Sequence, residues 1–158
     1  MLKKGCSLLL AVIMIFSLAG CSDILGRVIF HFLIANGDDR ADKDEVFAFV
    51  CENEENLLEA IENEDFSPYE NKGFITDISA YETVVDFSCG GVGMGPETAY
   101  VGFFYTPEGD MTALGWAPAS VNELIPSGSG FEWWEENGDN YYYVEHICGN
   151  FYYYELYF

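Results

Sequence analysis

Basic side chains are scarce in this sequence of 158 residues, which holds six lysines and arginines against 27 aspartates and glutamates. The formal net charge is −21, so the protein will repel the phosphate backbone of nucleic acids, and nucleic-acid binding is excluded. Only two histidines are present, and no Cys-x-x-Cys or His-x-x-x-His spacing occurs. The sequence therefore predicts no metal site and no cofactor.

A hydrophobic run long enough to span a bilayer is also lacking near the N-terminus. The apolar stretch at residues 8–16 is shorter than the ~20 residues that a membrane-spanning helix needs. It follows Lys3 and Lys4, and a short positive region before a short apolar region is typical of a secretory signal peptide. Residues 1–20 are therefore predicted to be a signal peptide.

The next residues, Leu18, Ala19, Gly20 and Cys21, resemble the lipobox of bacterial lipoproteins. The resemblance implies that a diacylglycerol is attached to the Cys21 thiol and that residues 1–20 are removed. Membrane lipid, held through Cys21, is then the first expected partner, and the protein lies on the extracytoplasmic side of the cell membrane. The chain also resembles the small uncharacterised lipoproteins of Gram-positive anaerobes, a group that implies a location rather than an activity.

The rest of the chain divides into a short proximal segment and one domain. Residues 21–41 are predicted to be the lipid anchor and an apolar membrane-proximal segment. Within them, residues 24–35 are apolar nearly all round, a pattern that fits a helix and a strand equally. Residues 42–158 are enough for a single domain with a hydrophobic core.

A helix is predicted at residues 42–63. Asp42 and Glu45 have the spacing of a capping box at its start. Apolar residues recur at helical spacing and should face the core: Val46, Phe47, Val50, Leu57, Leu58 and Ile61. The polar stretch at residues 52–56 leaves open a break into two helices.

Beyond this region, short β-type runs alternate with turns. Seven strands are predicted, at residues 73–79, 83–88, 99–105, 111–116, 131–135, 141–147 and 151–158. Short consecutive strands joined by tight turns are typical of an antiparallel sheet. The predicted fold class is α+β, with one or two N-terminal helices packed on an antiparallel β-meander of about five to seven strands.

A glycine-rich stretch at residues 88–96 follows the second predicted strand. In a phosphate-binding loop such glycines precede a helix, but Pro96 and a β-type run come next here. The stretch is therefore interpreted as a flexible connection between neighbouring strands.

Three cysteines remain once the signal peptide and the lipidated Cys21 are set aside: Cys51, Cys89 and Cys148. They permit at most one internal disulfide, and all three pairings stay open, with Cys89–Cys148 the first to test. Cys89 followed by His146 also resembles the order of nucleophile and base in papain-like cell-wall peptidases. The glycines after Cys89 oppose the helix that activates the cysteine in that family. A cell-envelope hydrolase using Cys89 and His146 is thus the alternative function.

The chain ends in a stretch dense in aromatic rings, residues 140–158. Gly149 and Asn150 suit a two-residue hairpin turn, which would place His146 opposite Tyr153. Rings then lie on both faces of the hairpin. One face should pack beneath the helix, and the other is either covered by a loop such as residues 117–130 or exposed as a tyrosine surface.

An exposed aromatic face is the feature that suggests a function. The residues predicted to form it are Trp133, Trp134, Tyr153 and Tyr157. Aromatic side chains combine a large apolar area with a polar edge and are frequent in binding surfaces. The leading hypothesis is therefore a non-enzymatic binding or interaction module, with an envelope protein or glycan as its partner.

Overall fold

The computed structural model describes residues 40–70, 72–94, 97–136 and 138–158. The predicted signal peptide, the lipidation site Cys21 and the apolar segment 24–35 lie outside these residues. Within them the chain forms one α-helix, one short 3-10 helix and seven strands. None of the helices described is both long enough and apolar enough to cross a membrane.

Helix α3 spans Lys43–Glu62 without a break. It begins after Asp42, whose side chain accepts a hydrogen bond of 3.0 Å from the backbone N–H of Asp44, so the predicted helix start is confirmed. Val46, Val50 and Leu57 are fully buried, and Phe47 and Ile61 pack against the core while partly buried. The prediction is wrong for Leu58, which is 37% exposed. The second helix that the polar stretch 52–56 left open does not form.

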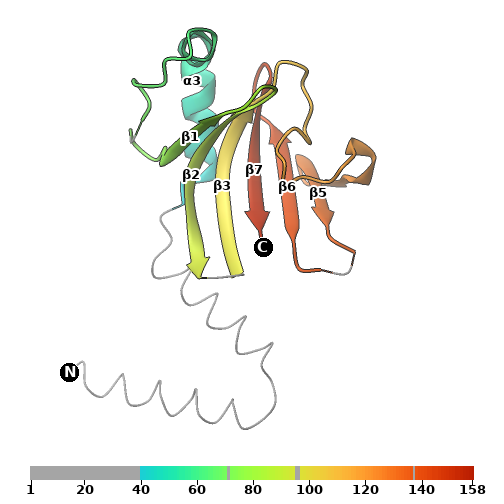
Figure 1. Ribbon diagram of the computed structural model, residues 1–158. Coiled ribbons are helices and arrows are strands. Elements are labelled where there is room, and N and C mark those ends of the chain that lie inside the picture. Colours follow the sequence, from blue (N-terminus) through green and yellow to red (C-terminus); the bar gives the residue numbers. More distant parts are fainter. Residues whose placement is uncertain (1–39, 71, 95–96, 137) are drawn as a thin grey trace, which may run out of the picture. The chain divides into compact units, whose positions relative to one another are not determined.

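The seven strands make one antiparallel sheet (Figure 1). They are β1 (Asp77–Ala80), β2 (Val85–Met94), β3 (Glu97–Tyr105), β4 (Ile125–Ser127), β5 (Gly130–Trp134), β6 (Tyr141–His146) and β7 (Phe151–Tyr157). The antiparallel α+β class is thus confirmed. A simple meander is wrong, because the order across the sheet is β1-β2-β3-β7-β6-β5-β4. After β3 the chain crosses to the far edge and returns strand by strand, until β7 pairs with β3.

The crossing segment, residues 106–124, covers the face of the sheet that α3 does not cover. We call this the loop face, and the opposite one the helix face. The strand predicted at 111–116 is wrong, because Asp110 starts a turn there and accepts a hydrogen bond of 2.8 Å from the N–H of Thr112. Leu114 and Leu124 of this segment are buried against the sheet. The segment also holds the 3-10 helix η1 (Val121–Glu123).

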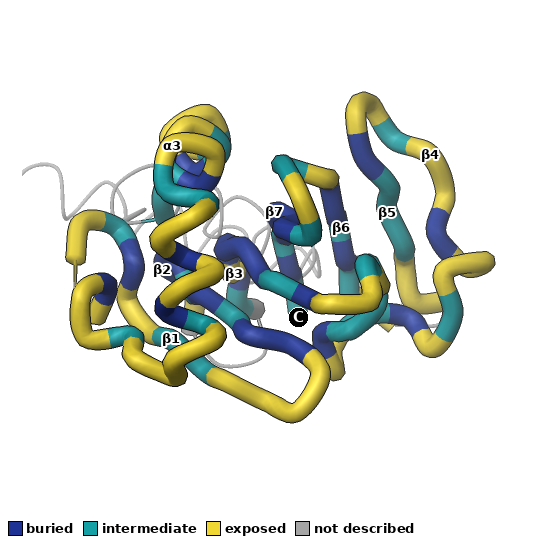
Figure 2. Tube along the Cα trace, turned by 90° about the horizontal axis from the view of Figure 1, so that it is seen from above, coloured by how far each residue is buried: buried dark blue, intermediate teal, exposed yellow. Residues whose placement is uncertain are grey.

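Helix α3 lies over β2, β3 and β7 on the helix face (Figure 2). Beneath it, the rings of Phe87 and Phe103 stack at a centroid distance of 4.6 Å. The central strands contain many buried residues, drawn as dark segments in Figure 2. These residues belong to two clusters, one on each face of the sheet. The core is therefore double, with one part under α3 and the other under the crossing segment.

The first turn of α3 is held to β6 by an ion pair. Lys43 bonds the carboxylate of Glu145, to which the Tyr143 hydroxyl also donates a hydrogen bond of 2.5 Å. Burial works against both charges, but the hydrogen bonds outweigh it, so the pKa of Lys43 is raised and that of Glu145 is lowered. The Lys43 ammonium also lies 5.1 to 5.6 Å from the ring centres of Phe47, Tyr143 and Tyr153.

The β6–β7 hairpin has a three-residue loop, residues 148–150, with Gly149 in the left-handed region at φ 51°. The prediction of a two-residue turn is therefore wrong by one residue, and His146 pairs with Tyr152 instead of Tyr153. Because paired residues share a face, this shift regroups every ring of the hairpin. Even-numbered residues of β6 and β7 face the crossing segment, and odd-numbered ones lie on the helix face.

The glycine-rich stretch is mostly strand rather than a flexible connection. Strand β2 continues through Gly90 and Gly91 to Met94, paired with β3. A bulge interrupts the register between Ser88 and Gly91, where Gly90 has a φ of 106°. Glycine can adopt the backbone conformation that the bulge requires. The stretch therefore forms a strand where its glycine content had predicted a loop.

Candidate functional site

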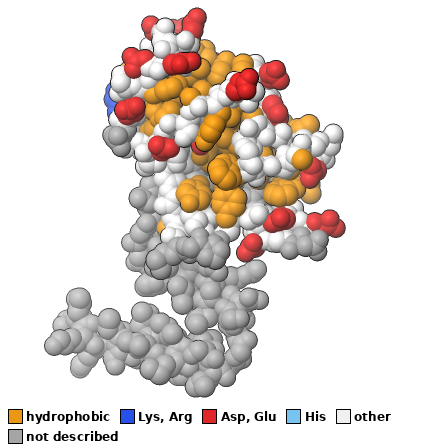
Figure 3. Space-filling view, in the orientation of Figure 1, with side chains coloured by type: hydrophobic (Ala, Val, Ile, Leu, Met, Phe, Trp, Pro, Cys, Tyr) orange, Lys and Arg blue, Asp and Glu red, His pale blue; other side chains and the backbone are white. Residues whose placement is uncertain are grey.

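A pocket of about 490 Å³ opens on the loop face, over β1, β2, β3 and β7. Trp116 of the crossing segment contributes to one side of it. In Figure 3, which has the orientation of Figure 1, hydrophobic side chains gather in the middle of this face and acidic side chains surround them. The volume lies within the range typical of small-molecule sites.

Five aromatic side chains wall this pocket: Tyr81, Tyr100, Trp116, Tyr154 and Phe158. The ring of Phe158 packs edge-on between Tyr100 and Trp116, at centroid distances of 6.2 and 5.9 Å. Tyr81 and Trp116 are 61% and 58% exposed. Large rings that are mutually braced and still open to solvent can receive a ligand with little rearrangement.

Asp86 provides a buried carboxylate in this pocket. It lies on β2, between Ser79 of β1 and Phe104 of β3. Burial raises the pKa of Asp86 from 3.8 to about 6, with the Tyr154 hydroxyl opposing the shift and the Asp77 charge adding to it. Its Oδ1 is buried without a hydrogen-bond partner, and no other side-chain atom in the described residues is in that position. That oxygen has an unused capacity to accept a hydrogen bond or to attract a positive charge.

Two glycines set the positions of two of the rings. A Cβ atom at Gly102 would lie 2.6 Å from the hydroxyl of Tyr154, and one at Gly91 would lie 2.6 Å from Cδ1 of Tyr100. The rings therefore cross directly over bare backbone. Each glycine faces its ring across neighbouring strands, so the sequence gives no local sign of this arrangement.

The charge of the pocket is negative. Its charged groups are the carboxylates of Asp77 and Asp86, and no lysine or arginine among the described residues lines it. The Ser79 hydroxyl donates a hydrogen bond of 3.2 Å to Asp77. The net charge of −21 on the whole chain adds a long-range field of the same sign. The pocket therefore favours a cation over an anion.

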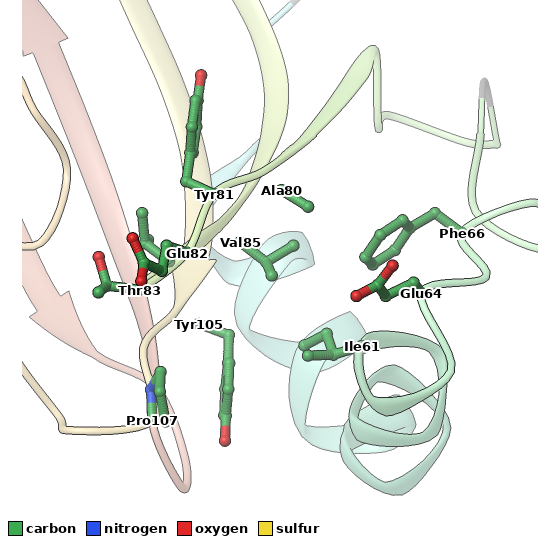
Figure 4. Close-up of a pocket in the computed structure, with 11 residues that line it drawn as sticks. Ile61, Glu64, Phe66, Ala80, Tyr81, Glu82, Thr83, Val85, Tyr105 and Pro107 are labelled. Atoms are coloured by element: carbon green, nitrogen blue, oxygen red, sulfur yellow. The ribbon is translucent and has the colours of Figure 1, made fainter.

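A second pocket, of about 520 Å³, lies between the end of α3 and the β1–β2 turn (Figure 4). Ile61 and Tyr105 contribute apolar surface to it, and Glu64 and Glu82 contribute carboxylates. Figure 4 shows the Tyr81 side chain directed away from Ile61 and Glu64. This pocket holds no buried polar atom without a partner, so the first pocket is the stronger candidate.

The four residues of the predicted binding face do not share one surface. Trp133 packs into the core of the loop face, while Tyr153 is 2% exposed beneath α3. Trp134 and Tyr157 lie on the helix face, joined by the ring of Tyr141 at centroid distances of 4.5 and 5.3 Å. Adjacent residues of a strand point to opposite faces, which separates the two tryptophans.

Cys89 and His146 are not brought together either. Cys89 is fully buried on the helix face, and its thiol donates a hydrogen bond of 3.4 Å to the Phe87 carbonyl. His146 is exposed on the loop face and donates a hydrogen bond of 2.9 Å to the Gly149 carbonyl. Burial, and then the Asp86 charge, raises the pKa of the Cys89 thiol far above its ordinary value. Such a thiol is a poor nucleophile.

No group of histidine, cysteine and acidic side chains that could hold a metal ion occurs in the part of the chain that the structure describes. Comparison with protein-family models, with curated proteins and with solved structures found no match to this chain. Its function must therefore be inferred from the chemistry of the pocket on the loop face.

Proposed function

We propose that this protein is a lipid-anchored extracytoplasmic binding protein, and that its domain binds a small organic cation in the pocket on the loop face. The proposed anchor is the lipidated Cys21, for which the support is the lipobox resemblance at residues 18–21. The proposed ligand carries an alkylated ammonium group, because such a group satisfies aromatic rings and a carboxylate at once.

The observation that carries this proposal is the Asp86 carboxylate within an aromatic enclosure. A cation over the face of an aromatic ring gains about 0.5–2 kcal/mol, and several rings act together in known ammonium sites. The unpartnered Oδ1 of Asp86 supplies a charge at a point where water is excluded, which strengthens the attraction. A carboxylate held there costs the fold stability, as expected of a group kept for binding.

Choline and its neutral isostere 3,3-dimethylbutan-1-ol test the proposal. The two molecules have nearly the same shape and differ in charge, so the comparison isolates the electrostatic contribution. In the full chain, held in a non-ionic detergent, choline should shift the indole N–H resonance of Trp116, and the isostere at equal concentration should not. Asp86→Asn should weaken choline binding roughly tenfold, or about 1.4 kcal/mol. Glu136→Gln, an exposed carboxylate outside the pocket, is the matched control.

Three outcomes would contradict the proposed ligand. Equal responses to choline and the isostere would mean that the pocket selects its ligand by shape and not by charge. A response to envelope glycans without a response to choline would favour a neutral sugar ligand. An unchanged affinity in Asp86→Asn would remove the carboxylate from the site.

The anchor is tested separately. Cys21→Ser should abolish the incorporation of labelled palmitate and move the protein from the membrane fraction to the soluble fraction of the cell envelope. Lys4→Gln retains the lipobox and is the control, so it should still be labelled. Palmitate labelling of Cys21→Ser would refute lipidation at this cysteine.

A further inference from the structure

Two thiols meet where the β6–β7 hairpin approaches α3. Cys51 lies on the exposed side of α3, and Cys148 is the first residue of the hairpin loop. The Cys51 thiol and the Glu54 carboxylate, one helical turn after Cys51, both lie near enough to Cys148 to raise the pKa of its thiol. Both thiols are free in the structure.

The backbone of the hairpin confirms how close this approach is. A Cβ atom at Gly149 would collide with the carboxylate of Glu54, so the loop lies directly against the helix. Cys148 also packs against the core of the helix face. The position of the hairpin loop and the packing of Cys148 therefore both place the Cys148 side chain beside α3.

We propose that Cys51 and Cys148 form a disulfide that links α3 to the β6–β7 hairpin when the protein meets a low-molecular-weight disulfide as oxidant. The pairing first suggested by the sequence, Cys89–Cys148, is replaced. Cys89 is 0% exposed and its thiol bonds the Phe87 carbonyl, whereas Cys51 is exposed beside Cys148.

The chemistry proceeds in two exchange steps. The exposed Cys51 thiolate attacks one sulfur of the oxidant, forming a mixed disulfide and releasing one thiol. The Cys148 thiolate then attacks the Cys51 sulfur, which releases the second thiol and closes the protein disulfide. In total two protein thiols lose two protons and two electrons, and one oxidant disulfide becomes two thiols.

The second step sets the rate. In the reduced protein burial, then the Cys51 thiol and the Glu54 carboxylate, raise the pKa of the Cys148 thiol; burial and Glu54 still do so once Cys51 is in the mixed disulfide. Little Cys148 thiolate is therefore present near neutral pH, and closure should accelerate as the pH rises. An extracytoplasmic compartment, as proposed above, is one in which such a bond persists.

The test is disulfide mapping of the full chain in non-ionic detergent after incubation with oxidised glutathione. Remaining thiols are alkylated, and proteolytic peptides are identified by mass spectrometry. The expected product is one cross-linked peptide pair containing Cys51 and Cys148, about 2 Da lighter than the two reduced peptides. Its rate of formation should increase roughly tenfold for each pH unit below the pKa of Cys148.

Two variants separate this pair from other products. Cys51→Ser should abolish the internal cross-link and leave Cys148 alkylated, while Cys89→Ala should leave the cross-link in place. The oxidised wild type should also unfold at a higher temperature than the reduced form, a difference that Cys51→Ser removes. Full alkylation of both Cys51 and Cys148 after oxidation, or a cross-link from Cys148 to Cys89, would overturn the proposal.

Discussion

Replacing Asp86 by asparagine should make this protein more stable at neutral pH, although the change removes a charge from the proposed site. Asparagine has the shape of aspartate but no charge to bury. It also retains an oxygen that can accept a hydrogen bond from the Tyr154 hydroxyl, which lies beside the carboxylate. The substitution therefore removes the cost of burying the charge and leaves the packing in place.

The size of this effect follows from the pKa of Asp86. Burial raises it from 3.8 to about 6, so the folded protein holds the proton roughly 150-fold more tightly than the unfolded chain does. At about 1.4 kcal/mol for each factor of ten, the ionised carboxylate costs the fold about 3 kcal/mol at neutral pH. Solvent that reaches the half-buried side chain reduces this value, so about 3 kcal/mol is an upper limit.

The sign of the effect gives a specific pH window. Below pH 3.8 the carboxyl is protonated in both states and costs nothing. Between pH 3.8 and about 6 the unfolded chain ionises first, so the wild type loses stability relative to the variant. Above about pH 6 the folded state ionises as well, and the difference becomes constant.

Urea unfolding of both proteins, followed by tryptophan fluorescence from pH 4 to pH 8, measures this difference directly. Asp86→Asn should match the wild type near pH 4 and exceed it by up to about 3 kcal/mol at pH 8. Asp77→Asn, at an exposed carboxylate of the same pocket, is the control and should show little gain. A difference that does not change with pH, or a less stable Asp86→Asn at pH 8, would refute the reasoning.

Three further predictions concern the pocket and the helix. Gly102→Ala should destabilise the fold by about 1–3 kcal/mol in urea unfolding, because its Cβ would lie 2.5 Å from a backbone carbonyl oxygen; Gly115→Ala, with nothing within 4 Å, should be neutral. Lys43→Met should lower the free energy of unfolding by about 1–2 kcal/mol above pH 4.5. This loss is smaller than for a fully buried ion pair, because Lys43 is 37% exposed. It should shrink as the pH falls and Glu145 is protonated. Adding Glu145→Gln to Lys43→Met should recover part of the lost stability. If the losses of the two single variants simply add in the double variant, Lys43 and Glu145 do not interact energetically. Choline affinity, measured by titration calorimetry, should fall as the pH drops through about 6 and Asp86 gains its proton; constant affinity down to pH 5 would assign binding to the rings alone.

Local signals in the sequence predict the helix well. The side chain of Asp42 caps α3 as its position before an apolar-periodic stretch predicts, and Val46 and Val50 are buried as their spacing predicts. The positions of β3, β5, β6 and β7 were predictable for the same reason, because alternation and turn residues act over a few neighbours. The sequence missed β4, and it placed the start of β1 and the end of β2 several residues too early. The strand at 111–116 fails because its apolar residues pack against the sheet from a series of turns.

The candidate site could not be predicted in this way. Its carboxylate, Asp86, is one of 27 acidic residues and has no distinguishing neighbours in the sequence. The pocket around Asp86 is completed by Tyr154 and Trp116, which come from β7 and from the crossing segment. The predicted face around Trp133 and Trp134 was chosen by composition, and strand alternation then divides it between two surfaces.

By itself the sequence determined the helix start at Asp42, the antiparallel α+β class and the strongly acidic surface, since each depends on neighbouring residues or on composition. Only the tertiary structure decided that β7 lies in the middle of the sheet, that the hairpin register shifts by one residue, and that Cys51 meets Cys148. The physical reason is that these features are set by contacts between distant parts of the chain. A one-residue shift exchanges the faces of a strand, and no local pattern distinguishes the two registers when rings lie on both sides.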